Sequence, residues 1–92
     1  MSIPLPYCVY VLFSEFDGNL YVGFSTDHTD RLTAHDTGNI PSTAPRRPFR
    51  LIFCEYYACR ADAVRREKYL KLAAGKRALK LMLPATLASL RR

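Results

Sequence analysis

The stretch Tyr7-Cys8-Val9-Tyr10-Val11-Leu12-Phe13, with Leu20-Tyr21-Val22-Gly23-Phe24 shortly after it, decides the fold. Both runs are rich in β-branched and aromatic residues, and the first is apolar throughout, as in a strand that is buried on both faces. Asp17-Gly18 between them is a turn signal. The sequence therefore predicts an antiparallel hairpin of residues 7–13 and 20–24.

The first half of the chain is then expected to continue with a short helix and a loop. Asp27 is a favourable N-cap residue and Gly38 suits the position just after a helix end, so a helix of about ten residues is expected between them. Residues 39–48 hold Pro41, Pro45 and Pro48 and are predicted to form a loop.

The second half is predicted to supply one strand and two helices. Residues 49–57 are rich in aromatic residues, as strands are. From about residue 60 to 73, apolar residues recur at steps of three and four, which indicates a helix. Gly75 is expected to break or kink this helix, a basic helix follows over residues 76–83, and Pro84 ends it.

These elements predict an α+β fold. Their order is strand, strand, helix, strand, helix, helix, which fits a three-stranded, mainly antiparallel sheet flanked by helices. A chain of 92 residues has room for one small domain. We expect residues 1–84 to form that domain and residues 85–92 to form a short basic C-terminal tail.

Positive charge is concentrated in the second half of the chain. The net charge of +6 divides into −4 for residues 1–45 and +10 for residues 46–92. This asymmetry indicates a polyanionic partner, with nucleic acid expected first and an anionic membrane second. The simpler alternative is that the Lys and Arg side chains only solvate helix surfaces.

Cysteine usage and hydropathy point to a soluble protein of the cytoplasm. The three cysteines are odd in number and include no CxxC pair, which argues against a disulfide framework or a structural zinc site. Residues 1–6 lack the features of a secretory signal, and no stretch approaches the ~20 apolar residues of a membrane span. We therefore expect no membrane association.

Glu67 is the most informative single residue because of its place in the helical pattern. It shares a face with Ala63, Val64 and Leu70, which should point to the core. A buried carboxylate there costs several kcal/mol unless it is paired or binds a cation. Two interpretations follow: a ligand for a hard divalent ion such as Mg²⁺, or an ion pair with Arg31 or another arginine.

Arg31 and His35 stand four residues apart, so both project from one side of the first helix. The arginine fork suits phosphate oxygens, and the imidazole can share a proton near neutral pH. The alternative is a solvated surface pair.

Tyr10 and Tyr21 are expected on neighbouring strands. Tyr21 shares a strand face with Gly23, whose missing side chain would let a ligand or a backbone come close. A phenol beside a cation loses its proton more readily and could activate a water molecule. Taken singly, each tyrosine is as well explained as an ordinary strand aromatic.

A further set of residues suits contact with phosphates without reading bases. It combines hydroxyls and arginines of the loop with basic residues of the later helices. The set comprises Ser42, Thr43, Arg46, Arg47, Lys68, Lys71, Lys76, Arg77 and Lys80.

Together these residues resemble the GIY-YIG nuclease superfamily, and in particular its small stand-alone bacterial members. The resemblance covers residues 7–80 and rests on motif elements that occur in the family's order. They are Val9-Tyr10-Val11-Leu12, Tyr21-Val22-Gly23, Arg31, His35, Gly38, Ser42-Thr43, Pro48 and Arg66-Glu67.

The resemblance implies a metal-dependent endonuclease that hydrolyses DNA phosphodiester bonds, in DNA repair, recombination or processing. It implies that Tyr10 and Tyr21 orient or deprotonate the attacking water and that Arg31 holds the scissile phosphate. Glu67 would bind one Mg²⁺ or Mn²⁺, and His35 would transfer a proton or contact phosphate. Gly23 would have the structural role of keeping the site open.

Two departures from the family pattern leave alternatives open. Cys8-Val9-Tyr10 matches the first triplet only in its tyrosine, and Leu79-Lys80-Leu81 has no asparagine where several members have one after the metal glutamate. The alternative function is a non-catalytic nucleic-acid-binding module with the same fold; a subunit that needs a partner is a third. DNA is the expected partner, with RNA left open, and a monomer or weak homodimer is expected.

Overall fold

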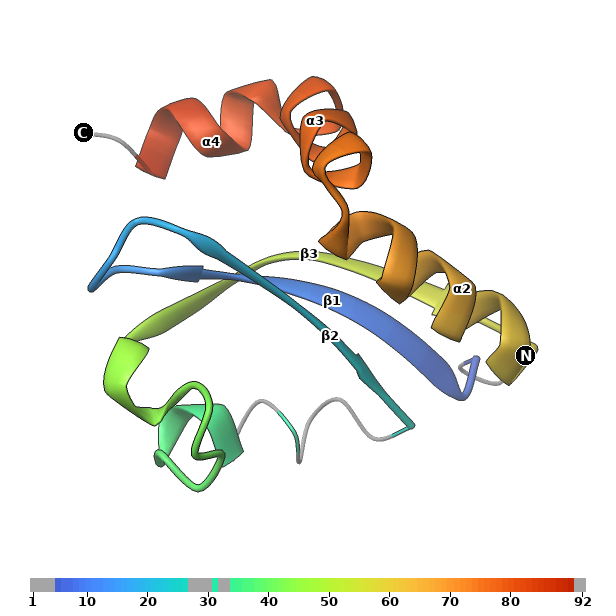
Figure 1. The fold of residues 1–92 in the computed structure, drawn as a ribbon, viewed down its shortest axis with the longest axis horizontal. Helices are drawn as coiled ribbons and strands as arrows, with labels where there is room; N and C mark the ends of the chain where they lie inside the picture. Colours follow the sequence, from blue (N-terminus) through green and yellow to red (C-terminus); the bar gives the residue numbers. More distant parts are fainter. Residues whose placement is uncertain (1–4, 27–30, 32–33, 91–92) are drawn as a thin grey trace.

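A three-stranded antiparallel sheet forms the centre of the molecule (Figure 1). The computed structural model describes residues 5–26, 31 and 34–90. The strands are β1 (Tyr7–Ser14), β2 (Leu20–Ser25) and β3 (Phe49–Tyr57), in the order β2-β1-β3. The predicted α+β fold is therefore confirmed, and the strands lie within two residues of their predicted limits.

The central place of β1 follows from its composition. An uninterrupted apolar run suits a strand with a neighbour on each side and covered faces, and residues 8–12 are almost completely inaccessible to solvent. The turn from β1 to β2 contains Gly18 at φ 74°, a conformation that glycine adopts without strain. This turn sets the register in which Tyr10 lies opposite Gly23 and Leu12 lies opposite Tyr21.

One face of the sheet is covered by three helices, α2 (Arg60–Lys71), α3 (Ala73–Met82) and α4 (Pro84–Leu90) (Figure 1). Leu70 and Leu79 are fully buried, and burial of a leucine side chain stabilises a fold by about 1.5–3 kcal/mol. They belong to a cluster that also contains Ala63 and the strand residues Val9, Val11 and Val22.

The segment from residue 34 to 46 covers the opposite face, where the picture shows it beneath the sheet (Figure 1). Arg31 and residues 34–36 are helical, and Gly38 adopts φ 77°, as expected for a residue just after a helix end. Asp27, the predicted N-cap, lies outside the described residues. On this face Tyr10 packs with Cys8 and Leu12.

The helix break differs from the prediction, and the structure adds detail to the loop and the tail. The break between the helices falls at Leu72, and Gly75 lies inside α3. Gly75 is buried, and an added Cβ would meet the Tyr69 carbonyl, so this glycine allows close packing of α3 against the end of α2. The loop contains the short 3-10 helix η1 (Ala44–Arg46), and the tail is helical to Leu90.

None of the helices in the described ranges has the length and apolar character needed to cross a membrane.

Candidate active site

A chain of hydrogen bonds links Tyr10 of β1 to the loop through a buried histidine. The Tyr10 hydroxyl lies 2.9 Å from His35 Nε2, and His35 Nδ1 lies 2.8 Å from Thr43 Oγ1. The Thr43 hydroxyl in turn donates to the carbonyl of Ile40 at 3.3 Å. Tyr10, His35 and Thr43 are at most 1% exposed, so this chain is shielded from water.

The directions of these bonds follow from the number of protons available. The Thr43 hydroxyl gives its one proton to Ile40, so its oxygen accepts the Nδ1–H of His35. Burial lowers the pKa of His35 below its ordinary value of 6.5, and the charge of Arg31 lowers it further. His35 is therefore neutral at pH 7, and its free Nε2 accepts the Tyr10 hydroxyl.

The other predicted site residues influence the Tyr10 hydroxyl through hydrogen bonding or charge. Burial raises the pKa of Tyr10 to about 12, a hydrogen bond from Arg31 lowers it, and the nearby Tyr21 and Glu67 raise it. Tyr10 is therefore protonated at neutral pH. Arg31, Tyr21 of β2 and Glu67 of α2 thus all affect the titration of this one phenol.

Gly23 makes room for this phenol. It lies directly opposite Tyr10 in the β1–β2 ladder, and a Cβ at residue 23 would overlap the Tyr10 ring and hydroxyl. Any larger residue would have to displace the phenol.

The aromatic rings of Tyr21 and Phe49 pack against the His35 ring. The Tyr21 ring stands edge-on to the His35 ring with centroids 5.1 Å apart, and Phe49 lies 6.0 Å from His35 in a similar arrangement. Such edge-to-face contacts restrict the orientation of the imidazole. Phe49 was not among the predicted site residues.

The site lies at the outer edge of β2. Tyr21 and His35 are on the sheet face covered by residues 34–46, whereas Glu67 belongs to α2 on the other face. A pocket of about 190 Å³ is lined by Tyr21 and Val22, which point to opposite faces, and by Lys71 of α2. Residues from both sheet faces therefore border one pocket at this edge strand.

Glu67 lies at the margin of the helix packing and not in the core. Its side chain is 20% exposed, and its Oε2 lies 3.1 Å from Lys71 Nζ. The sequence pattern placed Glu67 with Ala63 and Leu70, but only those two are fully buried. Glu67 therefore forms an ion pair, as one of the two sequence-based interpretations expected. Its partner is the exposed Lys71 and not an arginine.

The surroundings of Glu67 fit a magnesium ion of the kind that acts on phosphates. Such ions are held by one or two carboxylates, and water and substrate phosphate complete the shell. A single, partly exposed carboxylate meets that need, and Lys71 is 52% exposed and can turn away. Within residues 5–26, 31 and 34–90 there is no cluster of three or more His, Cys, Asp or Glu for a metal.

Thr43 has a different role from the predicted contact with phosphate. Its side chain is fully buried, and its oxygen is engaged by His35 and Ile40, so the structure corrects this interpretation. The hydroxyl supports the histidine. Nothing in the local sequence around Thr43 signals this role, because it depends on the tertiary packing of the loop against His35.

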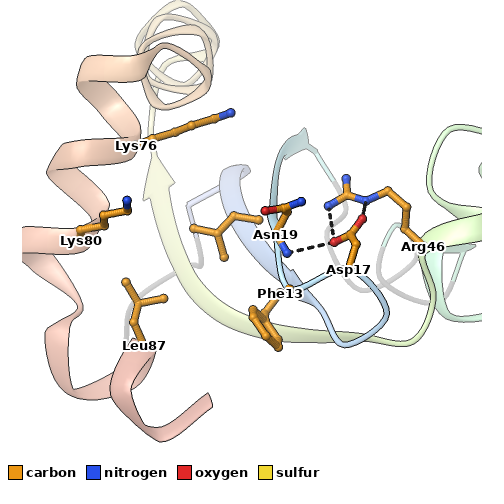
Figure 2. Close-up of a pocket in the computed structure, with 9 residues that line it drawn as sticks. Phe13, Asp17, Asn19, Arg46, Lys76, Lys80 and Leu87 are labelled. Atoms are coloured by element: carbon orange, nitrogen blue, oxygen red, sulfur yellow. Dashed lines mark hydrogen bonds and ion pairs between the residues drawn. The ribbon is translucent and has the colours of Figure 1, made fainter. Parts of the chain in front are cut away.

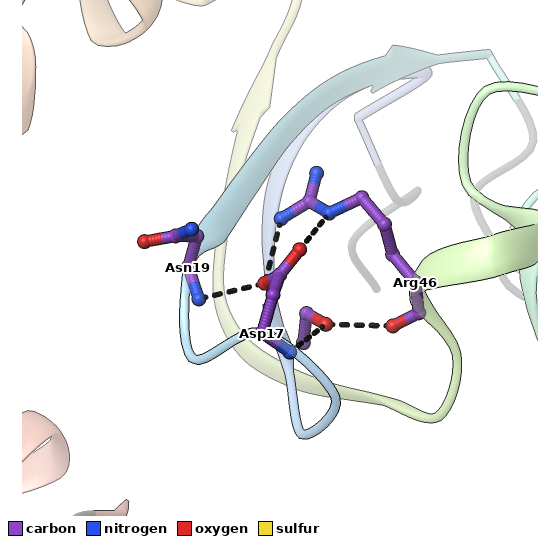
Figure 3. Close-up of polar contacts among 4 residues, drawn as sticks. Asp17, Asn19 and Arg46 are labelled. Atoms are coloured by element: carbon purple, nitrogen blue, oxygen red, sulfur yellow. Dashed lines mark hydrogen bonds and ion pairs between the residues drawn. The ribbon is translucent and has the colours of Figure 1, made fainter.

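The loop arginines are held by the protein itself. Arg46 Nε lies 2.6 Å from Asp17 Oδ2, and the same carboxylate accepts the backbone N–H of Asn19 (Figure 3). These contacts lower the pKa of Asp17 to about 2, with the Arg46 hydrogen bond as the main cause. Arg47 donates to the carbonyls of Ala44 and Asp36.

The other predicted phosphate contacts are exposed to solvent. Ser42 lies in the loop, and the basic residues lie on α2 and α3; they are Lys68, Lys71, Lys76, Arg77 and Lys80.

Comparison with known proteins identifies the family. A UPF0213 protein of Streptococcus agalactiae is 37% identical over 70 residues, covering 75% of this chain and 78% of that protein. A UPF0213 protein of Staphylococcus saprophyticus is 33% identical over 67 residues, covering 72% and 82%. No solved structure gives a significant match. The model of the GIY-YIG catalytic domain matches residues 6–80, and the chain therefore belongs to the GIY-YIG nuclease superfamily.

Proposed function

We propose that this chain is a metal-dependent endonuclease that hydrolyses DNA phosphodiester bonds. The observation that supports this best is the buried chain from Tyr10 through His35 to Thr43, whose tyrosine lies near Arg31 and feels the charge of Glu67. It provides a proton acceptor, a cation and a carboxylate at one strand edge, and these are the groups that phosphodiester hydrolysis needs.

The proposed reaction begins when one water molecule reaches the Tyr10 hydroxyl, which is buried in the free protein, from the side of Arg31. Because the pKa of Tyr10 is about 12, the phenolate is not populated at neutral pH before the reaction. The phenol therefore donates its proton to His35 Nε2 while it accepts a proton from the water. The water oxygen bonds to phosphorus, and the bond from phosphorus to the leaving oxygen breaks; the leaving oxygen keeps the bonding pair and takes up a proton from solvent. The Nδ1–H bond to Thr43 holds the imidazole in the tautomer that can accept this proton.

Arg31 and Tyr21 would act on the substrate side of the reaction. The exposed Arg31 guanidinium can bind the scissile phosphate and offset its growing negative charge. The Tyr21 hydroxyl can orient the attacking water. Mg²⁺ or Mn²⁺ at Glu67 would supply Lewis-acid stabilisation of charge on the phosphate oxygens.

A plasmid-nicking assay with Mg²⁺ or with EDTA tests this function. We expect Glu67→Gln and Arg31→Ala each to lower Mg²⁺-dependent nicking by about a hundredfold or more, the size of effect seen when charge stabilisation is lost. The matched control is Asp62→Asn, which removes an exposed carboxylate from the same helix and should nick normally. Full nicking by Glu67→Gln would rule out the proposed role of this residue.

A non-catalytic nucleic-acid-binding module is the second candidate, since Lys71 already neutralises Glu67. Binding of DNA with no product in Mg²⁺ or Mn²⁺ would favour it over hydrolysis. Under either function we propose a cytoplasmic protein, monomeric or weakly dimeric, that acts on DNA in repair, recombination or processing, with RNA as the other polyanion to test.

A further inference from the structure

A groove next to the site is lined by parts of the chain that the proposed reaction does not use. Its volume is about 610 Å³, and it lies between the β1–β2 turn on one side and helices α3 and α4 on the other. Figure 2 shows Lys76, Lys80 and Leu87 on the helices facing Phe13 and Asn19 across this opening.

The charges in the groove leave it positive. Lys76 and Lys80 are four residues apart on α3, so both reach the groove from one helix face. No described carboxylate lies within ion-pair distance of either lysine, whereas the third cation, Arg46, is already paired with Asp17. Two uncompensated cations remain, and they suit successive phosphates of a polyanion.

The groove adjoins a smaller pocket at the edge of β2 that contains Tyr21 of the candidate active site. Leu20 and Lys76 line both the groove and the smaller pocket that contains Tyr21 and Lys71. A strand whose scissile phosphate lies at Tyr21 would therefore enter the groove with its next phosphates.

The size and lining of the groove decide which form of nucleic acid it suits. Its volume of about 610 Å³ lies within the range of about 300–1,000 Å³ typical of pockets for drug-sized ligands, which is room for a few nucleotides of one strand. Three apolar side chains, Phe13, Leu20 and Leu87, stand beside the lysines. Apolar and aromatic surfaces beside a basic track are typical of sites for unpaired strands.

We propose that this groove binds a single-stranded segment of nucleic acid next to the cleaved bond, so the preferred substrate carries an unpaired arm. Lys76 and Lys80 contact the phosphates of the arm, and its bases rest on Phe13, Leu20 and Leu87. This inference rests on the proposed nuclease function and names its substrate class.

Binding measurements on the full chain test the inference. The probes are a blunt DNA duplex and the same duplex with a short oligothymidine arm, both carrying a fluorescent label, and the protein is Glu67→Gln so that cleavage does not interfere. We expect the arm to raise affinity about tenfold and Lys76→Ala/Lys80→Ala to remove that gain. The slope of log affinity against log salt should fall by about 1.4, because each single-strand phosphate contact contributes about 0.7.

The control Arg60→Ala/Arg65→Ala removes the same charge from α2, outside the groove, and should keep the preference for the arm. Circular dichroism at matched temperatures checks that all variants fold. Equal affinity for both probes, or equal effects of the two double variants, would overturn the groove proposal even if plasmid nicking persists. A lysine-dependent preference for the arm, together with no plasmid nicking by the wild type in Mg²⁺ or Mn²⁺, would support the groove and overturn hydrolysis.

Discussion

At the scale of single residues, His35 determines the chemistry of the site because it is kept neutral. It is buried, faces Tyr10 and Thr43, and lies near the charges of Arg31 and Asp36. A histidine whose pKa is lowered by folding stabilises the native state most at pH values above 6.5. That stabilisation is lost as pH falls below 6.5 towards the pKa of the folded state.

We therefore expect the free energy of unfolding to decrease as the pH is lowered from 7.5 to 5, with a contribution from His35 of at most about 1.4 kcal/mol per pH unit. Urea titrations of the wild type and of His35→Gln across this range measure it. The variant keeps every other titratable group, so the difference between the two curves isolates His35. Parallel curves would show that His35 does not titrate in this way.

Gly23 carries the second prediction at this scale. In Gly23→Ala the new methyl group overlaps the Tyr10 ring, so the phenol must move away from His35. We expect loss of most nicking activity and a destabilisation of about 1–3 kcal/mol, the usual cost of overpacking. Val9→Ile adds one methyl to the core on the other face of β1 and should cost similar stability with nicking retained. Equal activity of the two variants would contradict the prediction.

At the scale of elements, the contact between α2 and α3 depends on Gly75. Helix propensity alone predicts that Gly75→Ala stabilises the protein by about 1 kcal/mol. The structure predicts the opposite sign, because the added Cβ meets the Tyr69 carbonyl and the backbone of Leu70. We expect a destabilisation of about 1–3 kcal/mol in urea unfolding. Ala74→Gly, at the exposed neighbouring position, should lose about 1 kcal/mol, and a stabilised Gly75→Ala would refute the packing argument.

The same element shows where sequence reasoning succeeds and where it fails. The strands were predictable, since composition alone distinguishes β1 as a central strand. The position of the helix break was not predictable. Gly75 suggested an interruption because glycine has a low helix propensity, but in the structure it lets the backbones of α3 and α2 approach each other. Only the tertiary packing reveals this role. Thr43 was misread for a related reason, because a hydroxyl in a proline-rich loop gives no sign that it will be buried beneath a histidine.

At the scale of the whole molecule, the sequence predicts which residues belong to the candidate site but not how they are arranged in space. The order of Tyr10, Tyr21, Arg31, His35 and Glu67 suggested convergence. The sequence could not show that the first four approach from one sheet face and Glu67 from the other, with the β2 edge between them. Beyond the β2 edge, Lys76 and Lys80 of α3 extend the basic surface towards the β1–β2 turn, and α4 adds the apolar Leu87.

Helix α4 offers the last prediction, because it lies beyond residues 6–80 and has no buried residue. Leu83, which packs against the core, precedes it. A chain ending at Leu83 should therefore unfold cooperatively with a midpoint only a few degrees lower, since about 1 kcal/mol shifts Tm by roughly 4–8 °C in a domain of this size. It should still nick plasmid DNA, while its preference for an arm-bearing duplex falls because Leu87 is gone from the groove. Loss of cooperative unfolding would instead make α4 part of the folding unit, and an unchanged preference would show that the wall formed by α4 does not contact the arm.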